Sequence, residues 1–187
     1  MGYTHYIYRP VKNAGSAYFY GKLALDAKKL CEYANANGIR IRNGEGLGEP
    51  EFGEFSFSIN GDAEAFSDEG RDLAHETFYW AGIPEQSEWR KTEPDFFNFC
   101  KTAYKPYDAV ITAILIRAKV IYGSCVRISS DGDWEGNPNF PDGYGSWENG
   151  RELYETVFGE VAECPFETAN NRYFLPKPSA PSRHLAE

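Results

Sequence analysis

Four short segments with strand patterning follow one another between residues 39 and 101, and no helical pattern separates them. Phe55, Phe57 and Ile59 alternate with serines, which is typical of a strand with one buried face. Strands that follow each other without a crossover helix pair in an antiparallel way. The middle of the chain therefore predicts a mainly antiparallel sheet.

Apolar residues recur at helical spacing in three further places, on both sides of these strands. We therefore predict an α+β fold, in which about three helices pack on a sheet of about five to six strands as a single pair of layers. We expect one domain over residues 1–175 and a proline-rich, flexible tail over 176–187. The predicted strands cover residues 3–8, 39–42, 55–59, 75–80, 96–101 and 126–130, and the predicted helices cover 16–37, 106–123 and 146–159.

The charge of the chain bears on its partners. The formal net charge is -9 and the pI is about 4.9, so a general basic footprint for nucleic acid is missing and no direct nucleic-acid contact is expected. No apolar run approaches the length of about 18 residues that a membrane span needs. We expect a cytoplasmic protein without a membrane partner, and the sequence does not predict the oligomeric state.

The densest polar cluster runs from Cys100 to Asp108, where a predicted strand passes into a predicted helix. A helix N-terminus favours an anion, and Lys101 and Lys105 add positive charge beside it. A phosphate or a carboxylate is therefore expected here. In the alternative interpretation Asp108 simply occupies the first helical turn and the lysines are solvated.

Two histidines lie in predicted strands. His5 shares a strand face with Tyr3, and Arg9 follows at the end of that strand, while His75 opens a later strand. Either imidazole could act as a general base or bind phosphate, although a hydrogen-bonded structural histidine is the simpler reading. The chain has no H-x-x-x-H spacing, so we predict no zinc site and no cofactor.

The segment S-S-D-G places Ser130 and Asp131 at the end of the last predicted strand. Their side chains could hydrogen-bond a ligand at the rim of the sheet, or they could simply form an Asx-type turn. The same segment starts a weak candidate for a calcium loop, but a strand precedes it where an EF-hand has a helix. That candidate consists of Asp131, Asp133, Glu135, Asn137 and Asp142.

The blocks MGYTHY, HETF, FCKTAYKPYD and SSDG resemble those of a family of small uncharacterised bacteriophage and prophage proteins. The resemblance covers the chain to about residue 132 and brings no known activity. Tyr104 stands where the family often has a basic residue, which weakens the case for positive charge at that position. The resemblance implies a phage accessory protein that counters host defence from the cytoplasm of the bacterium. It also implies one polar site made of His5, Asn60, Asp62, His75, Lys101, Lys105, Asp108, Ser130 and Asp131.

The first functional hypothesis is a domain that binds a phosphate-bearing, nucleotide-like small molecule. Tyr3 or Tyr6 would stack on a base, and Asp62 and Asp131 would accept hydrogen bonds from the sugar or base. The phosphate would form charge-assisted hydrogen bonds with Lys101, Lys105 and Arg9.

Two other functions stay open. A small phosphoesterase or transferase would use His5 or His75 as acid and base, with Asp108 or Asp131 as the partner. An acidic inhibitor of a host defence nuclease or CRISPR effector, similar to an anti-CRISPR protein, would need only its surface charge.

Overall fold

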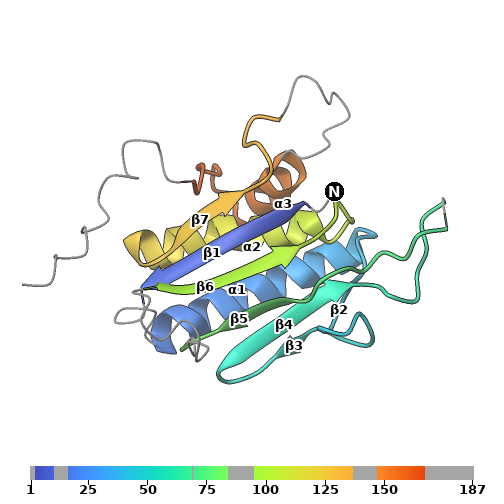
Figure 1. Ribbon diagram of the computed structural model, residues 1–187, viewed down its shortest axis with the longest axis horizontal. Helices are drawn as coiled ribbons and strands as arrows, with labels where there is room; N and C mark the ends of the chain where they lie inside the picture. Colours follow the sequence, from blue (N-terminus) through green and yellow to red (C-terminus); the bar gives the residue numbers. More distant parts are fainter. Residues whose placement is uncertain (1–2, 11–16, 69, 84–94, 137–146, 167–187) are drawn as a thin grey trace, which may run out of the picture.

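The computed structural model describes residues 3–10, 17–68, 70–83, 95–136 and 147–166. It confirms the α+β class, with three α-helices and antiparallel strands (Figure 1). The described strands are β1 (Thr4–Pro10), β2 (Ile41–Arg42), β3 (Glu51–Phe52), β4 (Ser56–Gly61), β5 (Phe78–Ala81), β6 (Asp95–Lys101) and β7 (Arg127–Ser130). The helices are α1 (Ala17–Ala36), α2 (Asp108–Tyr122), the short 3-10 helix η3 (Gly123–Cys125) and α3 (Glu148–Phe158). Among them, none is both long and apolar enough to pass through a membrane.

The strands form two hydrogen-bonded sheets. In the first, β1 lies between β6 and β7, and in the second β4 pairs with β2, β3 and β5. The amide of Asn98 on β6 donates to the carbonyl of Tyr79 on β5 across the boundary between the two sheets. Because both neighbours of β1 run antiparallel to it, β6 and β7 end where β1 begins. His5 therefore lies opposite both Cys100 and Ser130.

The helices cover one face of the sheets, with α1 and α2 side by side behind the strands in Figure 1 and α3 packed against α2. One stripe of α1 is buried, at helical spacing from Tyr20 to Ala34. By contrast, α2 is buried on nearly all sides from Ala109 to Ala118, because a sheet and two helices surround it. This explains why its sequence is almost uniformly apolar.

Arg117 is a largely buried charged residue on the otherwise mostly apolar helix α2. Its Nε donates to Asp26 on α1 at 2.8 Å, and its Nη1 donates to Glu160 at 3.0 Å. Tyr154 on α3 also donates to Glu160, at 2.7 Å. Since removing one member of a buried ion pair leaves an uncompensated charge, this network holds the three helices in one arrangement.

Several predicted elements begin later than expected; the strand predicted from residue 39, for example, begins at Ile41. The strand predicted from residue 75 begins only at Phe78, because the Asn60 side chain takes up the backbone N–H and C=O of His75 that a ladder would use. The helix predicted from Pro106 begins at Asp108, and Pro106 lies in the turn before it.

The contact between α2 and α3 gives a test of the packing. A Cβ on Gly150 would overlap Thr112 Oγ1 and lie 3.1 Å from the Ala109 carbonyl oxygen. We expect Gly150→Ala to lower the free energy of unfolding by about 1–3 kcal/mol, as overpacked sites do, in urea titrations followed by circular dichroism. Gly21→Ala on α1 is the control: a Cβ there meets no atom within 4 Å, so the helix should gain roughly 0.5–1 kcal/mol. Equal effects of the two substitutions would contradict the packing described.

Candidate functional site

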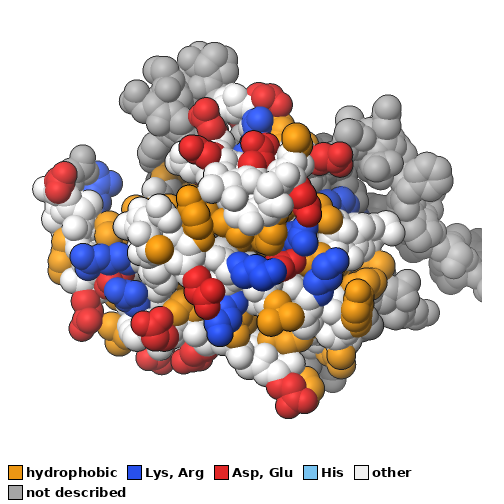
Figure 2. Space-filling model, turned by 180° about the vertical axis from the view of Figure 1, so that it is seen from behind, with side chains coloured by type: hydrophobic (Ala, Val, Ile, Leu, Met, Phe, Trp, Pro, Cys, Tyr) orange, Lys and Arg blue, Asp and Glu red, His pale blue; other side chains and the backbone are white. Residues whose placement is uncertain are grey.

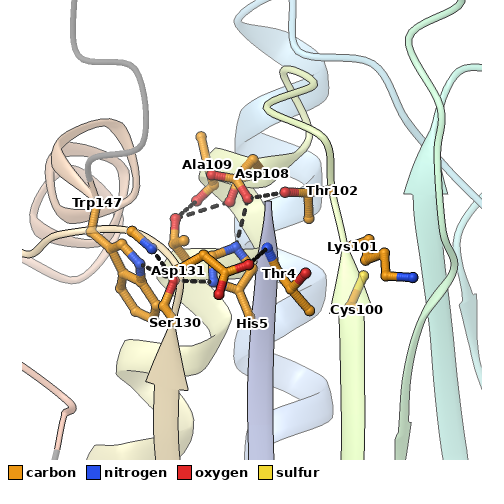
Figure 3. Close-up of polar contacts among 12 residues, drawn as sticks. Thr4, His5, Cys100, Lys101, Thr102, Asp108, Ala109, Ser130, Asp131 and Trp147 are labelled. Carbon is orange, nitrogen blue, oxygen red and sulfur yellow. Dashed lines mark hydrogen bonds and ion pairs between the residues drawn. The ribbon is translucent and has the colours of Figure 1, made fainter. Parts of the chain in front are cut away.

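His5 lies at the centre of the polar cluster where β1 begins (Figure 3). Its Nε2 is 2.7 Å from Asp108 Oδ1, and its Nδ1 is 3.0 Å from Ser130 Oγ. The imidazole is fully buried, between the edges of the Tyr3 and Trp147 rings. The imidazole of His5 therefore connects β1 to the start of α2 and to the end of β7.

The hydrogen-bond partners of Ser130 fix the tautomer of this histidine. Ser130 Oγ accepts from the backbone N–H of Gly132 at 3.0 Å and from Trp147 Nε1 at 3.2 Å. With both lone pairs used, the hydroxyl hydrogen is left to donate to His5 Nδ1. Nε2 then carries the ring proton and donates it to the Asp108 carboxylate.

Asp108 connects this histidine to the start of α2. Its Oδ1 also accepts from Thr102 Oγ1 at 2.5 Å, and its negative charge suits the first turn of a helix. The chain of bonds from Ser130 through His5 and Asp108 to Thr102 is called the His5 relay below. It joins β7, β1 and the β6–α2 turn.

The order Ser130, His5, Asp108 is that of a catalytic triad, but the geometry favours a positioning role. A nucleophilic serine needs a free lone pair and room for a substrate, and both lone pairs of Ser130 are engaged. The imidazole also has no exposed surface. The relay is built to hold the turn beside it in place.

That turn runs from Thr102 to Lys105 and carries backbone strain. Ala103 and Tyr104 have φ values of 50° and 59°, and the N–H of Lys105 donates to the Thr102 carbonyl at 3.0 Å, as in a type I′ turn. Residues with a Cβ rarely adopt this conformation, because it costs roughly 1–2 kcal/mol for each of them. The Tyr104 ring stacks on Tyr3 with centroids 4.2 Å apart.

Two cavities adjoin at this strained turn, and Tyr104 and Pro106 line both of them. The helical cavity, of about 540 Å³, lies between the end of α1, the start of α2 and α3. The turn cavity, of about 370 Å³, contains Lys105 and Arg71. The remaining walls of the helical cavity are Tyr33, Asn37, Ile39, Ala109, Asn149, Glu152, Leu153 and Thr156, and those of the turn cavity are Ser67, Asp68, Asp72, Leu73 and Ala103.

Several residues expected in one site do meet here. His5, Asp108 and Ser130 form the relay, and Asp131 lies beside it, accepting from the backbone N–H of Thr4 at 3.0 Å and from the Tyr6 hydroxyl at 3.3 Å. The Tyr3 hydroxyl is buried near Ser130 but makes no hydrogen bond of normal geometry within the described part of the chain. Burial, and then the charge of Asp108, raise the pKa of Tyr3, so this hydroxyl keeps its proton.

Other expected residues lie elsewhere. Arg9 is four residues further along β1, about 13 Å from His5 at the rise of a strand. The Asn60 side chain is hydrogen-bonded to backbone groups. Asp62 accepts hydrogen bonds from two backbone N–H groups and forms an ion pair with Arg42 at 3.0 Å. Lys101 pairs with Glu76 at 3.5 Å and borders neither cavity.

Within the described residues, the remaining candidates do not form an anion or metal site of the expected kind. The His75 side chain is exposed. The first amides of α2 donate to the carbonyls of Lys105, Pro106 and Tyr107, so they are not free for an anion. Of the calcium candidates, Asn137 and Asp142 lie outside the described residues, and within those residues no three His, Cys, Asp or Glu side chains cluster closely enough to hold a metal.

Local sequence patterns missed Trp147 and most walls of the helical cavity. Trp147 follows a long polar stretch of sequence, and Tyr33, Asn149 and Glu152 come from helices distant in sequence from the Cys100–Asp108 cluster. Only their packing in three dimensions brings them to Tyr104. Comparison of the chain with protein-family models, curated proteins and solved structures finds no match.

Removing the Ser130 hydroxyl tests the relay. Ser130→Ala leaves the Trp147 and Gly132 N–H donors and the His5 Nδ1 acceptor without their partner. We expect a loss of about 1–3 kcal/mol in the free energy of unfolding, measured by urea titration. The neighbouring Ser129 is exposed, so Ser129→Ala should change stability by less than about 0.5 kcal/mol. A Ser130→Ala protein as stable as the wild type would rule out the relay as a structural link.

Proposed function

We propose that the protein binds a phosphate-bearing, nucleotide-like small molecule across the two cavities that share Tyr104 and Pro106. The observation that carries the proposal is the chemical difference between them: one cavity is mostly uncharged, and the other is lined by two cations, Lys105 and Arg71, and two carboxylates, of which the exposed Asp72 is paired with Lys105. A ligand with a nucleoside-like part and a phosphate would satisfy both. The resemblance to phage proteins suggests that such binding sequesters a signal of host defence.

The helical cavity suits the uncharged part of such a ligand. Its volume of about 540 Å³ falls in the range of pockets that hold small molecules. Tyr33, Tyr104 and Leu153 offer apolar surface, and Asn37 and Asn149 offer amides that can both donate and accept hydrogen bonds. Aromatic walls with a few fixed polar groups are typical of sites that select a ring system with polar edges.

The turn cavity suits the phosphate. Lys105 Nζ lies 3.6 Å from Asp72 Oδ1 and also donates to the backbone carbonyl of Asp72. The Asp72 side chain is 53% exposed, and ion pairs of this kind contribute little to stability. A phosphate could therefore replace this carboxylate at Lys105 at small cost, with Arg71 as a second cation on the same wall.

Backbone strain at the shared wall supports a binding role. Two consecutive residues with positive φ persist only when their surroundings dictate them, and such strain concentrates at functional sites. Here the relay fixes Thr102 at one end of the turn, and Tyr3 stacks on the Tyr104 ring. A wall fixed before binding lowers the entropy that a ligand must lose.

The charge distribution of the helical face favours this hypothesis over an inhibitor that acts through an acidic patch on that face. On the helical face shown in Figure 2, acidic side chains are interspersed with lysines and arginines. A mixed surface gives weaker steering toward a basic partner than a patch of one sign.

Titration of the protein with mant-labelled ADP tests the proposal. Lys105→Gln should weaken binding by about tenfold or more, because a charge-assisted bond to phosphate contributes roughly 1.5–3 kcal/mol. Lys101→Gln is the matched control, since Lys101 borders neither cavity, and it should bind as the wild type does. Circular dichroism would confirm that both variants are folded.

Three results would count against the account. Wild-type protein that does not bind the probe at high micromolar concentration would contradict nucleotide binding, and equal losses in the two lysine variants would contradict its location. ADP that returns chemically altered after long incubation would replace binding with the phosphoesterase or transferase alternative.

A further inference from the structure

One face of α3 supplies four walls of the helical cavity. Residues three and four positions apart lie in one stripe of a helix, and the cavity walls on α3 follow this spacing. They are Asn149, Glu152, Leu153 and Thr156. The other walls come from the end of α1, the segment after it, the strained turn and the start of α2. Polar groups on this stripe of α3 therefore border the space that a ligand would occupy.

Glu152 is the one charged residue among the walls of the helical cavity. Within the described part of the chain, its carboxylate makes no hydrogen bond and no ion pair. Glu155 on the same helix differs, because its Oε1 accepts from the backbone N–H of Ala162 at 3.0 Å. Both oxygens of Glu152 are therefore available to accept hydrogen bonds from a ligand.

Asn149 lies one helical turn before Glu152 on the same stripe. Cβ atoms three residues apart in a helix are about 5–6 Å from each other, so these two side chains can bind neighbouring atoms of one planar ring. Tyr33 and Tyr104 bring aromatic rings to the same cavity. The cavity thus combines ring surfaces with a carboxylate and an amide side by side.

We propose that the base of the bound nucleotide is guanine and that Glu152 selects it; this inference rests on the proposed function above. Among the common bases, guanine alone has two adjacent donors on its Watson–Crick edge, N1–H and the 2-amino group. A carboxylate accepts such a pair through its two oxygens. The neighbouring O6 of guanine accepts from the Asn149 amide. Adenine presents the lone pair of its N1 at this place, which the Glu152 carboxylate repels.

Displacement of mant-labelled GDP by unlabelled GDP, IDP and ADP tests this base preference. Hypoxanthine, the base of IDP, keeps the N1–H donor of guanine but lacks the 2-amino group. We expect the wild type to bind GDP most tightly and IDP more weakly. ADP should bind at least about tenfold more weakly than GDP, because the charge-assisted bonds to Glu152 are lost. It should still bind through its phosphates and the apolar surface of its ring.

Glu152→Gln should change the preference for the base. The glutamine oxygen accepts from one donor of guanine, and its nitrogen donates to N1 of adenine, so the preference for GDP over ADP should fall by about tenfold. Glu152 is exposed and glutamine is an equally good helix former, so circular dichroism should show an unchanged fold. Glu32→Gln is the matched control: it removes an exposed charge from α1 but borders neither cavity, and it should keep the wild-type preference.

The possible results separate this inference from the proposed function. Equal displacement by GDP and ADP, together with weaker binding of both in Lys105→Gln, would overturn guanine recognition while nucleotide binding stands. A preference for GDP that survives in Glu152→Gln would overturn the role of Glu152, and equal displacement by GDP and IDP would overturn the paired hydrogen bonds. A wild-type protein that binds none of these nucleotides would contradict the proposed function itself.

Discussion

The hydrogen bonds of one buried imidazole join the parts of the protein on which the candidate site depends. His5 has no exposed surface, so its two ring nitrogens must both be satisfied inside the protein, and Ser130 and Asp108 satisfy them. Through Asp108 the same network reaches Thr102, where the strained turn begins. Fixing this turn places Tyr104 between the two cavities. The proposed binding surface thus follows from the pairing of one strand with its two neighbours.

The fold accommodates its two largely buried arginines in two different ways. Arg117 is paired on both sides, by Asp26 and Glu160, and links three helices. Arg9 has aromatic faces, a carbonyl and the Tyr122 hydroxyl as partners, but no carboxylate among the described residues. Two carboxylates offset the lost hydration of Arg117, whereas aromatic faces and neutral acceptors offset part of that of Arg9.

The class of the fold could be predicted from the sequence because periodicity reports burial directly. The alternation of Phe57 and Ile59 with serines and the helical spacing in α1 mark faces that pack against a core, whereas Phe55, the first residue of the same pattern, precedes β4 and is exposed. His75 shows where this reasoning fails: the amide of Asn60, fifteen residues away, takes the bonds of a predicted strand. The division into two sheets was not predicted either, since alternation does not say which strands pair.

The candidate site was predictable only in part. Asp108 and Ser130 stand at the ends of elements, where polar residues are conspicuous, and His5 stands near the start of one. Their meeting depends on β1 lying between β6 and β7, which no local pattern specifies. Arg9 follows the same strand but belongs to its other end, so a list of polar residues could not assign it. The walls of the helical cavity come from three helices, the segment after α1 and the strained turn, and they carry no shared sequence signal.

Native mass spectrometry of the purified protein, followed by denaturation and identification of what is released, tests the central claim most directly. The account predicts one phosphate-bearing small molecule per chain, present on the wild type and absent from the Lys105→Gln variant. A protein that carries no small molecule, and takes up none from a mixture of nucleotides added at millimolar concentration, would contradict it.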